Sequence, residues 1–129
     1  MVIVSMYQHF YLGNVRQIIY AVLGSFFISK WCIVVDDDVD VYDWNQVQWA
    51  LVTRVQPHRD IFITDNKFPG VALDPSIHLD IRKIPRVQTS KIGIDATKNF
   101  KGHDFPPLVL DTEERVPQVL NRWKEYGFK

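Results

Sequence analysis

The stretch from Lys30 to Arg54 constrains the fold of this chain more than any other. It begins with the apolar run Trp31–Val35, which is typical of a buried strand. Four acids then follow within five residues: Asp36, Asp37, Asp38 and Asp40. Beyond Asp43 the apolar residues take up a helical spacing, at Trp44, Val47, Ala50 and Leu51. The pattern predicts a buried strand, an acidic turn and a packed helix, which together form half of a βαβ unit.

The other periodic segments predict a small α/β domain. Further strands are expected at Val2–Met6, Asp60–Ile63 and Lys91–Asp95. Helices are expected from Asn14 to Gly24, over 43–55, and from Thr112 to Tyr126. Gly93, inside one of the strands, suggests a close approach of other atoms to the backbone. We therefore expect a small, mostly parallel sheet flanked by helices, in one domain over residues 1–129.

Local patterns suggest how these helices begin and which faces they bury. Asn14 with Gln17, and Asp43 with Gln46, have the spacing of a capping box. The helix over 43–55 is expected to bury Trp44, Val47, Leu51 and either Trp49 or Ala50. The last helix has one apolar face, formed by Val116, Val119, Leu120 and Trp123.

Composition excludes several classes of function. The 15 basic and 15 acidic residues give a formal net charge of zero, which argues against nonspecific binding to nucleic acid or to an anionic membrane. The one cysteine, Cys32, lies in an apolar run and is expected to be a core residue, as in a reducing cytosol. The longest apolar run of the first helix, Ile18–Ile28, is too short to span a bilayer, and no basic region precedes it. We expect a soluble, cytoplasmic protein.

The acidic turn has two interpretations. Loops at the carboxyl ends of parallel strands often bind ligands, and carboxylates are ligands for Mg²⁺ or Mn²⁺, as in a phosphotransfer domain. The turn lacks the glycine and the closing glutamate of an EF-hand, and the Lys and Ser/Thr partners of a phosphotransfer site are missing. The alternative, which the spacing favours, is a structural turn whose aspartates cap backbone amides or pair with Arg54 or Arg59. His9 is interpreted as a loop residue, because no second His or Cys lies at metal-binding spacing.

Several motifs, in order along the chain, resemble the C-terminal region of the UbiD-like decarboxylases. The run from Lys30 to Pro57 resembles a family segment in which an acidic strand end leads to a helix of the WALVTR type and then a proline. Tyr11–Gln17 resembles the start of a family helix, although Leu12 and Asn14 depart from its pattern. Leu73–Ser76 (LDPS), Ser90–Thr97 (SKIGIDAT) and Trp123–Gly127 (WKEYG) resemble further family segments.

This resemblance implies a reversible, non-oxidative decarboxylation of an aromatic or α,β-unsaturated acid. Family members use prenylated FMN, with a divalent metal (Mn²⁺ or Mg²⁺) and potassium at its phosphate, and are three to four times longer than this chain. Their catalytic glutamate-arginine-glutamate set has no counterpart here, so the resemblance gives no catalytic residue and no metal ligand in this chain. It implies that Leu73 contacts the substrate and that Lys30 lies near the flavin phosphate. The acidic run is a family signature and not the catalytic metal site.

Two interpretations of the function remain open. In one, the chain completes a decarboxylase or carboxylase by associating with a chain that carries the flavin-binding portion, or as a homo-oligomer, and binds no cofactor alone. In the other, it is a non-catalytic fragment or assembly module.

Overall fold

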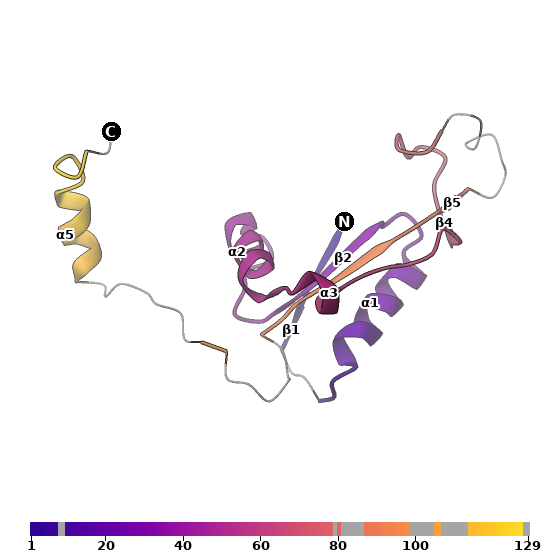
Figure 1. Cartoon of the computed structure of the whole chain (residues 1–129), viewed down its shortest axis with the longest axis horizontal. Coiled ribbons are helices and arrows are strands. Elements are labelled where there is room, and N and C mark those ends of the chain that lie inside the picture. The colour runs from indigo at the N-terminus through magenta and orange to yellow at the C-terminus, as the bar shows by residue number, and fades with distance from the viewer. Residues whose placement is uncertain (8–9, 79, 81–86, 99–104, 107–113, 128–129) are drawn as a thin grey trace.

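The centre of the molecule is a four-stranded sheet with helices on both faces (Figure 1). The computed structural model describes residues 1–7, 10–78, 80, 87–98, 105–106 and 114–127. The sheet contains β1 (Val2–Met6), β2 (Trp31–Asp36), β6 (Ile92–Ala96) and β3 (Ile61–Ile63) in that spatial order. β2 pairs in parallel with β1 and with β6, whereas β3 is antiparallel to β6. The predicted α/β fold with a mostly parallel sheet is confirmed.

β2 is buried on both of its faces, which explains its continuous apolar sequence. Its side chains alternate between two core clusters. Cys32 and Val34 pack beneath α1 (Asn14–Ser25), with Ile19 and Leu23. Ile33 and Val35 join the cluster beneath α2 (Trp44–Arg54), together with Val47, Ala50, Ile94 and Ala96. The interpretation of Cys32 as a core residue is confirmed: it is fully buried, and burial raises the pKa of its thiol to about 11.

The predicted helix starts are right for α2 and wrong for α1. Asp43 caps α2 by accepting a hydrogen bond from the Asn45 amide at 2.9 Å. In a capping box the Gln46 side chain would accept a hydrogen bond from the Asp43 amide. Here it accepts one from the Asp40 amide instead, at 3.0 Å, and so binds the acidic turn. Asn14 lies inside α1 and does not cap it; Gly13 precedes the helix without a side-chain bond. α1 also runs through Gly24 to Ser25.

The buried face of α2 is rotated from the predicted one. Val47, Ala50 and Arg54 are buried, while Trp44 and Trp49 are 51% and 38% exposed. The expectation that Trp44 is buried was therefore wrong, and Leu51 is only partly buried. The buried stripe of α2 ends at Arg54, a charged residue that an apolar pattern does not include.

The segment after α2 contains a short helix that the sequence analysis did not predict. α3 (Pro57–Asp60) begins with Pro57 in its first turn, so Asp60 belongs to this helix and the following strand starts one residue later, at Ile61. Proline is well suited to a first turn because its missing N–H has no helical acceptor there. No described helix is both long and apolar enough to cross a membrane.

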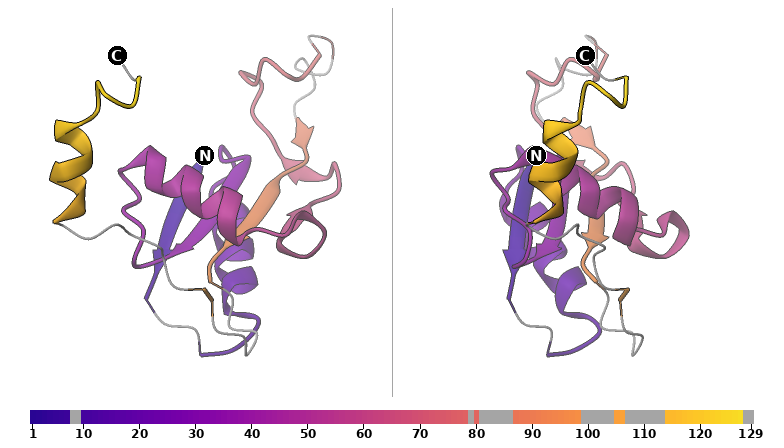
Figure 2. Two further views of the ribbon diagram at one scale, coloured as in Figure 1. Left: turned by 60° about the vertical axis from the view of Figure 1, so that its left-hand side comes forward. Right: turned by 90° about the vertical axis from the view of Figure 1, so that its left-hand side faces the viewer.

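One strand pair and one helix lie away from the central sheet (Figures 1 and 2). β4 (Phe68–Pro69) and β5 (Gln88–Thr89) form a separate antiparallel pair. α5 (Arg115–Asn121) has no buried residue and ends before Tyr126, so the predicted end of this helix was wrong. The predicted apolar face is exposed at Val116, Val119 and Leu120, and Trp123 lies in the turn after the helix and is also exposed. Pro117 fits in the first turn of α5. His9 and the predicted helix start at Thr112 lie outside the described residues, and the prediction of one domain over 1–129 stays a prediction.

Gly93 lies where the sheet leaves no space for a side chain. A Cβ atom built on Gly93 would lie 2.5 Å from Cζ of Phe62 and closer still to Cγ2 of Ile19. Ile19 is fully buried and belongs to the α1 cluster. The close approach that the sequence suggested at Gly93 is confirmed, and its partners are side chains of α1 and β3.

We expect Gly93→Ala to lower the free energy of unfolding by about 1 to 3 kcal/mol, because the added methyl group must displace packed side chains. Urea denaturation followed by tryptophan fluorescence measures the change. Gly24→Ala is the matched control, since Gly24 is helical and a Cβ atom added to it would meet no other atom within 4 Å. Alanine should stabilise α1 there by about 0.5 to 1 kcal/mol. Equal stability of Gly93→Ala and the wild type would contradict the packing.

Candidate functional site

The residues singled out by the sequence lie at opposite edges of the sheet. Lys30 directly precedes β2, and Asp36 is its last residue, so the strand separates them by roughly 20 Å. Lys30 is close to the start of β6, because the Ile92 amide donates to the Lys30 carbonyl at 2.8 Å. The acidic turn is therefore at the carboxyl edge of the parallel strands, while Lys30 is at the amino edge.

At the carboxyl edge, Arg54 holds the acidic turn. Its Nη1 donates to Asp36 Oδ2 and to Asp38 Oδ1, each at 3.0 Å, and its Nη2 donates to Asp38 Oδ2 at 2.9 Å. The side chain of Arg54 is 1% exposed. The guanidinium lies 5.3 Å from the ring centre of Trp49 and 5.8 Å from that of Phe105. The pairing with Arg54 that the sequence gave as one alternative is present.

A second cation completes this network. The Lys98 amide donates to Asp36 Oδ2 at 2.6 Å, and Lys98 Nζ lies 2.6 Å from Asp38 Oδ2. Desolvation disfavours the ionised form of Asp38, but the hydrogen bonds from Arg54 and Lys98 outweigh it, so the pKa of Asp38 is lowered. Lys98 follows β6, so the network connects the ends of β2 and β6 and the helix between them.

Two further acids bind backbone amides. Asp40 accepts a hydrogen bond from the Tyr42 amide at 2.9 Å, and Asp43 caps α2. Within the described ranges, no three or more His, Cys, Asp or Glu side chains are grouped to hold a metal ion. Asp37 is exposed, and the other carboxylates of the turn are bound to a guanidinium, an ammonium and backbone amides. The structure here supports a structural turn.

At the amino edge, Lys30 binds the LDPS segment. Its Nζ lies 2.8 Å from Asp74 Oδ2 and donates to Ser76 Oγ at 2.9 Å. Ser76 in turn donates to Asp74 Oδ1 from its hydroxyl at 2.7 Å and from its amide at 3.0 Å. Leu73 immediately precedes this cluster and is 90% exposed. The structure thus brings together Lys30 and the segment of Leu73, the two site residues that the sequence analysis named.

The electrostatics of this edge centre on Asp74. The hydrogen bond from Lys30 is the largest of the effects that lower the pKa of Asp74 to about 2, and bonds from Ser76 add to it. An ammonium group has three N–H donors, of which Asp74 and Ser76 use two. One donor of Lys30 is left for an anion, and its side chain is 35% exposed. The role of Lys30 at a flavin phosphate stays a prediction.

Lys91 is a buried cation that the sequence analysis missed. It precedes β6, is 1% exposed, and its Nζ donates to the carbonyls of Leu23 at 2.6 Å and Phe26 at 3.1 Å. It therefore binds the carboxyl end of α1, where a positive charge is favourable. Burial lowers the pKa of Lys91. A lysine inside the SKIGIDAT motif was the available signal, but sequence spacing cannot tell an inward lysine from a surface one.

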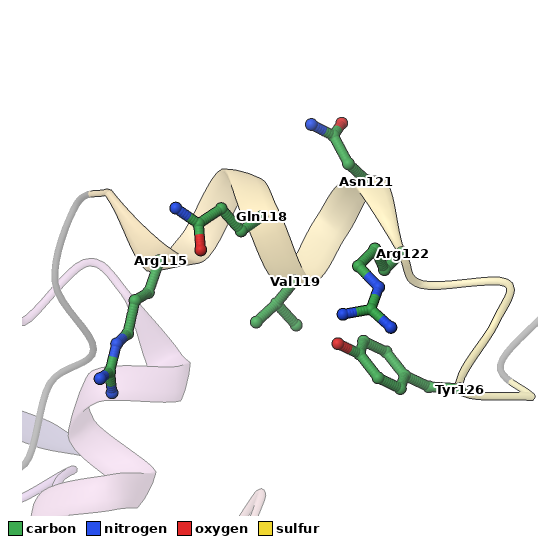
Figure 3. A pocket seen from close by; sticks show the side chains of 6 residues that line it. All are labelled: Arg115, Gln118, Val119, Asn121, Arg122 and Tyr126. Atoms are coloured by element: carbon green, nitrogen blue, oxygen red, sulfur yellow. The ribbon is translucent and has the colours of Figure 1, made fainter.

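A third place, on α5, offers a groove of about 410 Å³ lined by Arg115, Gln118, Val119, Asn121, Arg122 and Tyr126 (Figure 3). The guanidinium of Arg122 lies 5.5 Å from the ring centre of Tyr126 and also binds Glu125 at 2.7 Å. The groove contains neither of the predicted site residues.

Comparison with known proteins gives a consistent match. Residues 1–96 match the family model of the 3-octaprenyl-4-hydroxybenzoate carboxy-lyase C-terminal domain, UbiD_C. The UbiD-class enzyme HmfF from Pelotomaculum thermopropionicum, in complex with FMN, is 29% identical, with a TM-score of 0.69 over 88% of this chain and 24% of that one. The vanillic acid decarboxylase of Sedimentibacter hydroxybenzoicus, in closed form, is 33% identical, with a TM-score of 0.67 over 96% of this chain and 25% of that one.

An evolved dimeric form of HmfF in complex with prenylated FMN shares the fold. It is 24% identical, with a TM-score of 0.59 over 88% of this chain and 20% of that one. The chain therefore spans about a quarter or less of the length of these solved structures.

We expect Arg54→Leu to destabilise the chain by about 3 kcal/mol or more, because it leaves the buried carboxylate of Asp36 without its guanidinium partner. Arg54→Lys should recover only part of the loss, since an ammonium cannot form the forked bonds to Asp38. Thermal and urea denaturation measure both changes.

The control is Lys67→Met, which removes an ion pair with Asp65 whose side chains are 79% and 60% exposed. Its effect should stay below about 1 kcal/mol. A loss in Arg54→Leu no larger than that of this control would contradict the assigned role of Arg54.

Proposed function

Because the chain belongs to the UbiD family and matches the C-terminal domain of that family, we propose that it forms part of a larger enzyme. This enzyme is a non-oxidative decarboxylase or reversible carboxylase that acts on an aromatic or α,β-unsaturated acid. The observation that supports this proposal is the match of residues 1–96 to the family's C-terminal domain. The chain spans about a quarter of the length of its solved relatives. The catalytic set and most cofactor contacts belong to a flavin-binding portion that joins this chain in the active assembly.

The surface of the chain supports a partner. Large apolar side chains are exposed at both ends of α1, including Leu12 at 71%, Phe26 at 61% and Ile28 at 68%. The apolar face of α5 is also exposed. Exposed apolar side chains mark an interaction site where they form a contiguous patch. The partner is either a chain that carries the flavin-binding portion or a further copy in a homo-oligomer.

The fit of the chain to the cofactor is limited. Lys30 offers one remaining N–H to a phosphate, and one lysine donor is less than the set of cations and amides that usually binds such a group. Asp36 and Asp38 of the acidic turn are paired with Arg54 and Lys98, and the described residues contain no group of three or more side chains that could hold a metal ion. FMN or prenylated FMN, the divalent metal and potassium are therefore assigned to the flavin-binding portion, and no chemical step passes through residues of this chain.

The contribution of this chain to the site is apolar contact. Leu73 has no hydrogen-bonding side-chain atom and is 90% exposed, so it can cover one face of a substrate ring and exclude water from it. In this proposal the LDPS segment forms the substrate side of the cleft.

The association is tested by purifying the tagged chain from cells of its own source and measuring two signals. We expect a larger chain to copurify, with visible absorbance of a flavin, and CO₂ release from vanillic acid or another aromatic acid. An untagged extract handled in the same way is the control. The absence of any larger chain and of flavin under every condition would contradict the proposal. The non-catalytic interpretation predicts a marginally stable fold with exposed apolar surface, so a monodisperse monomer with a sharp melting transition would count against that interpretation.

In the active assembly, we expect Leu73→Ala to raise KM for the acid about tenfold, which corresponds to about 1.4 kcal/mol of lost apolar contact. The change in kcat should be smaller, because the contact is present in substrate and transition state alike. Val52→Ala on α2 is the control, since Val52 is also exposed, at 77%, and should leave KM unchanged. An unchanged KM in Leu73→Ala would remove Leu73 from the substrate site.

A further inference from the structure

The segment that carries Leu73 has half-buried apolar residues only at its two ends, Val71 and Ile77. Over residues 71–78 Asp74 is the one buried residue, at 8% exposure, whereas Ala72, Leu73, Pro75 and Ser76 are exposed. The segment leaves the β4–β5 pair at Gly70, whose amide donates to the Val87 carbonyl at 2.8 Å. Between Val71 and Ile77, no apolar side chain is buried to hold the turn on which Leu73 is exposed.

A polar cluster takes the place of that anchor. Lys30 reaches Asp74 and Ser76 across 44 and 46 residues of sequence, with distances of 2.8 and 2.9 Å, and so connects the segment to the start of β2. Within the segment, Asp74 accepts both the amide and the hydroxyl of Ser76. The Asp74 amide donates to the Val71 carbonyl at 3.1 Å, which closes the turn around Leu73. We call Lys30, Asp74 and Ser76 the clasp.

We infer that the clasp fixes the turn on which Leu73 is exposed, and that Lys30 and Asp74 are positioning residues for the substrate side of the cleft. In this role, the ammonium group of Lys30 serves first to hold the turn and only second to bind an anion. The statement that this turn is part of a substrate site rests on the proposed function. The statement that the clasp orders the turn concerns this chain alone.

Three features favour this role over that of an ordinary surface ion pair. The carboxylate is buried, its second oxygen is occupied by two bonds from Ser76, and the ion pair joins segments far apart in sequence. An isolated exposed pair contributes little because both side chains lose rotamer freedom for a screened attraction. Here the same interaction removes freedom from a turn that has no other buried side chain, so its loss should appear as motion at Leu73.

The test measures backbone and methyl relaxation by NMR on the full chain, comparing Lys30→Met, Asp74→Asn and the double variant. In the wild type we expect order parameters near 0.85 at the amides of Ala72, Leu73 and Ser76, and below about 0.6 in each variant. The double variant should be no more mobile than either single one, since both remove the same contact. Lys30→Arg should keep most of the order. Lys67→Met, which removes a neighbouring exposed pair, should have no effect.

A second readout follows the charge of Asp74. Its carboxyl carbon should titrate with a pKa of about 2 in the wild type and move toward its ordinary value of 3.8 in Lys30→Met. The sign follows from linkage: the clasp contributes order above pH 3.8, and the contribution is lost as the pH falls through about 2. Unchanged amide signals of β6, such as Ile94, show that a variant has kept its fold. Ser76→Ala, which keeps both charges, is the milder variant if the others unfold.

Two results would overturn the clasp. One is wild-type order at Leu73 in both Lys30→Met and Asp74→Asn. The other is loss of order in Lys30→Met alone, which would mean that Lys30 acts on a group other than Asp74. None of these measurements needs a partner or a flavin, so failure of the clasp and failure of the proposed decarboxylase assembly are separate outcomes. If the assembly is active, both variants should raise KM about as much as Leu73→Ala.

Discussion

Burial of β2 on both faces is the constraint from which the rest of the structure follows. A strand whose successive side chains all lie in core needs a layer on each side of the sheet, and α1 and α2 provide those layers. It also needs a neighbour at each edge, which β1 and β6 provide in parallel. Parallel neighbours require long crossovers, and those crossovers are α1 and the segment from α2 to β5. The short antiparallel β3 then covers the outer edge of β6.

Sequence reasoning recovered the features that depend on local pattern. The continuous apolar run identified β2, Asp43 identified the start of α2, and Gly93 identified a place without room for a side chain. It failed where the position of a side chain depends on distant partners. Trp44 has the spacing of a core residue but is half exposed, because the orientation of α2 is fixed partly by Arg54 and its carboxylates. Lys91 has the sequence pattern of a surface residue and is buried beneath the end of α1.

For the candidate site, too, local patterns were predictable from the sequence and contacts between distant residues were not. The family resemblance named Lys30 and Leu73, and the LDPS motif contained Asp74 and Ser76, whose bonds to each other follow a common local pattern. No sequence rule predicts that Lys30 reaches that motif across more than forty residues. The acidic turn, in contrast, attracted a metal interpretation because four carboxylates are close in sequence. Its cationic partners, Arg54 and Lys98, lie on separate elements and become visible only when the chain is folded.

The placement of the two charged clusters at opposite edges of the sheet has a consequence for how such a domain can change. The network at Arg54 connects β2, α2 and the end of β6, so substitutions there act on the whole fold. The turn around Leu73 contributes one buried carboxylate and otherwise lies outside the core. Under the proposed function, the residues that contact the substrate and the residues that stabilise the fold are different parts of one short chain. A lineage of such domains could then exchange the residues next to Leu73 to accept acids of another size, while the sheet and its helices stay the same.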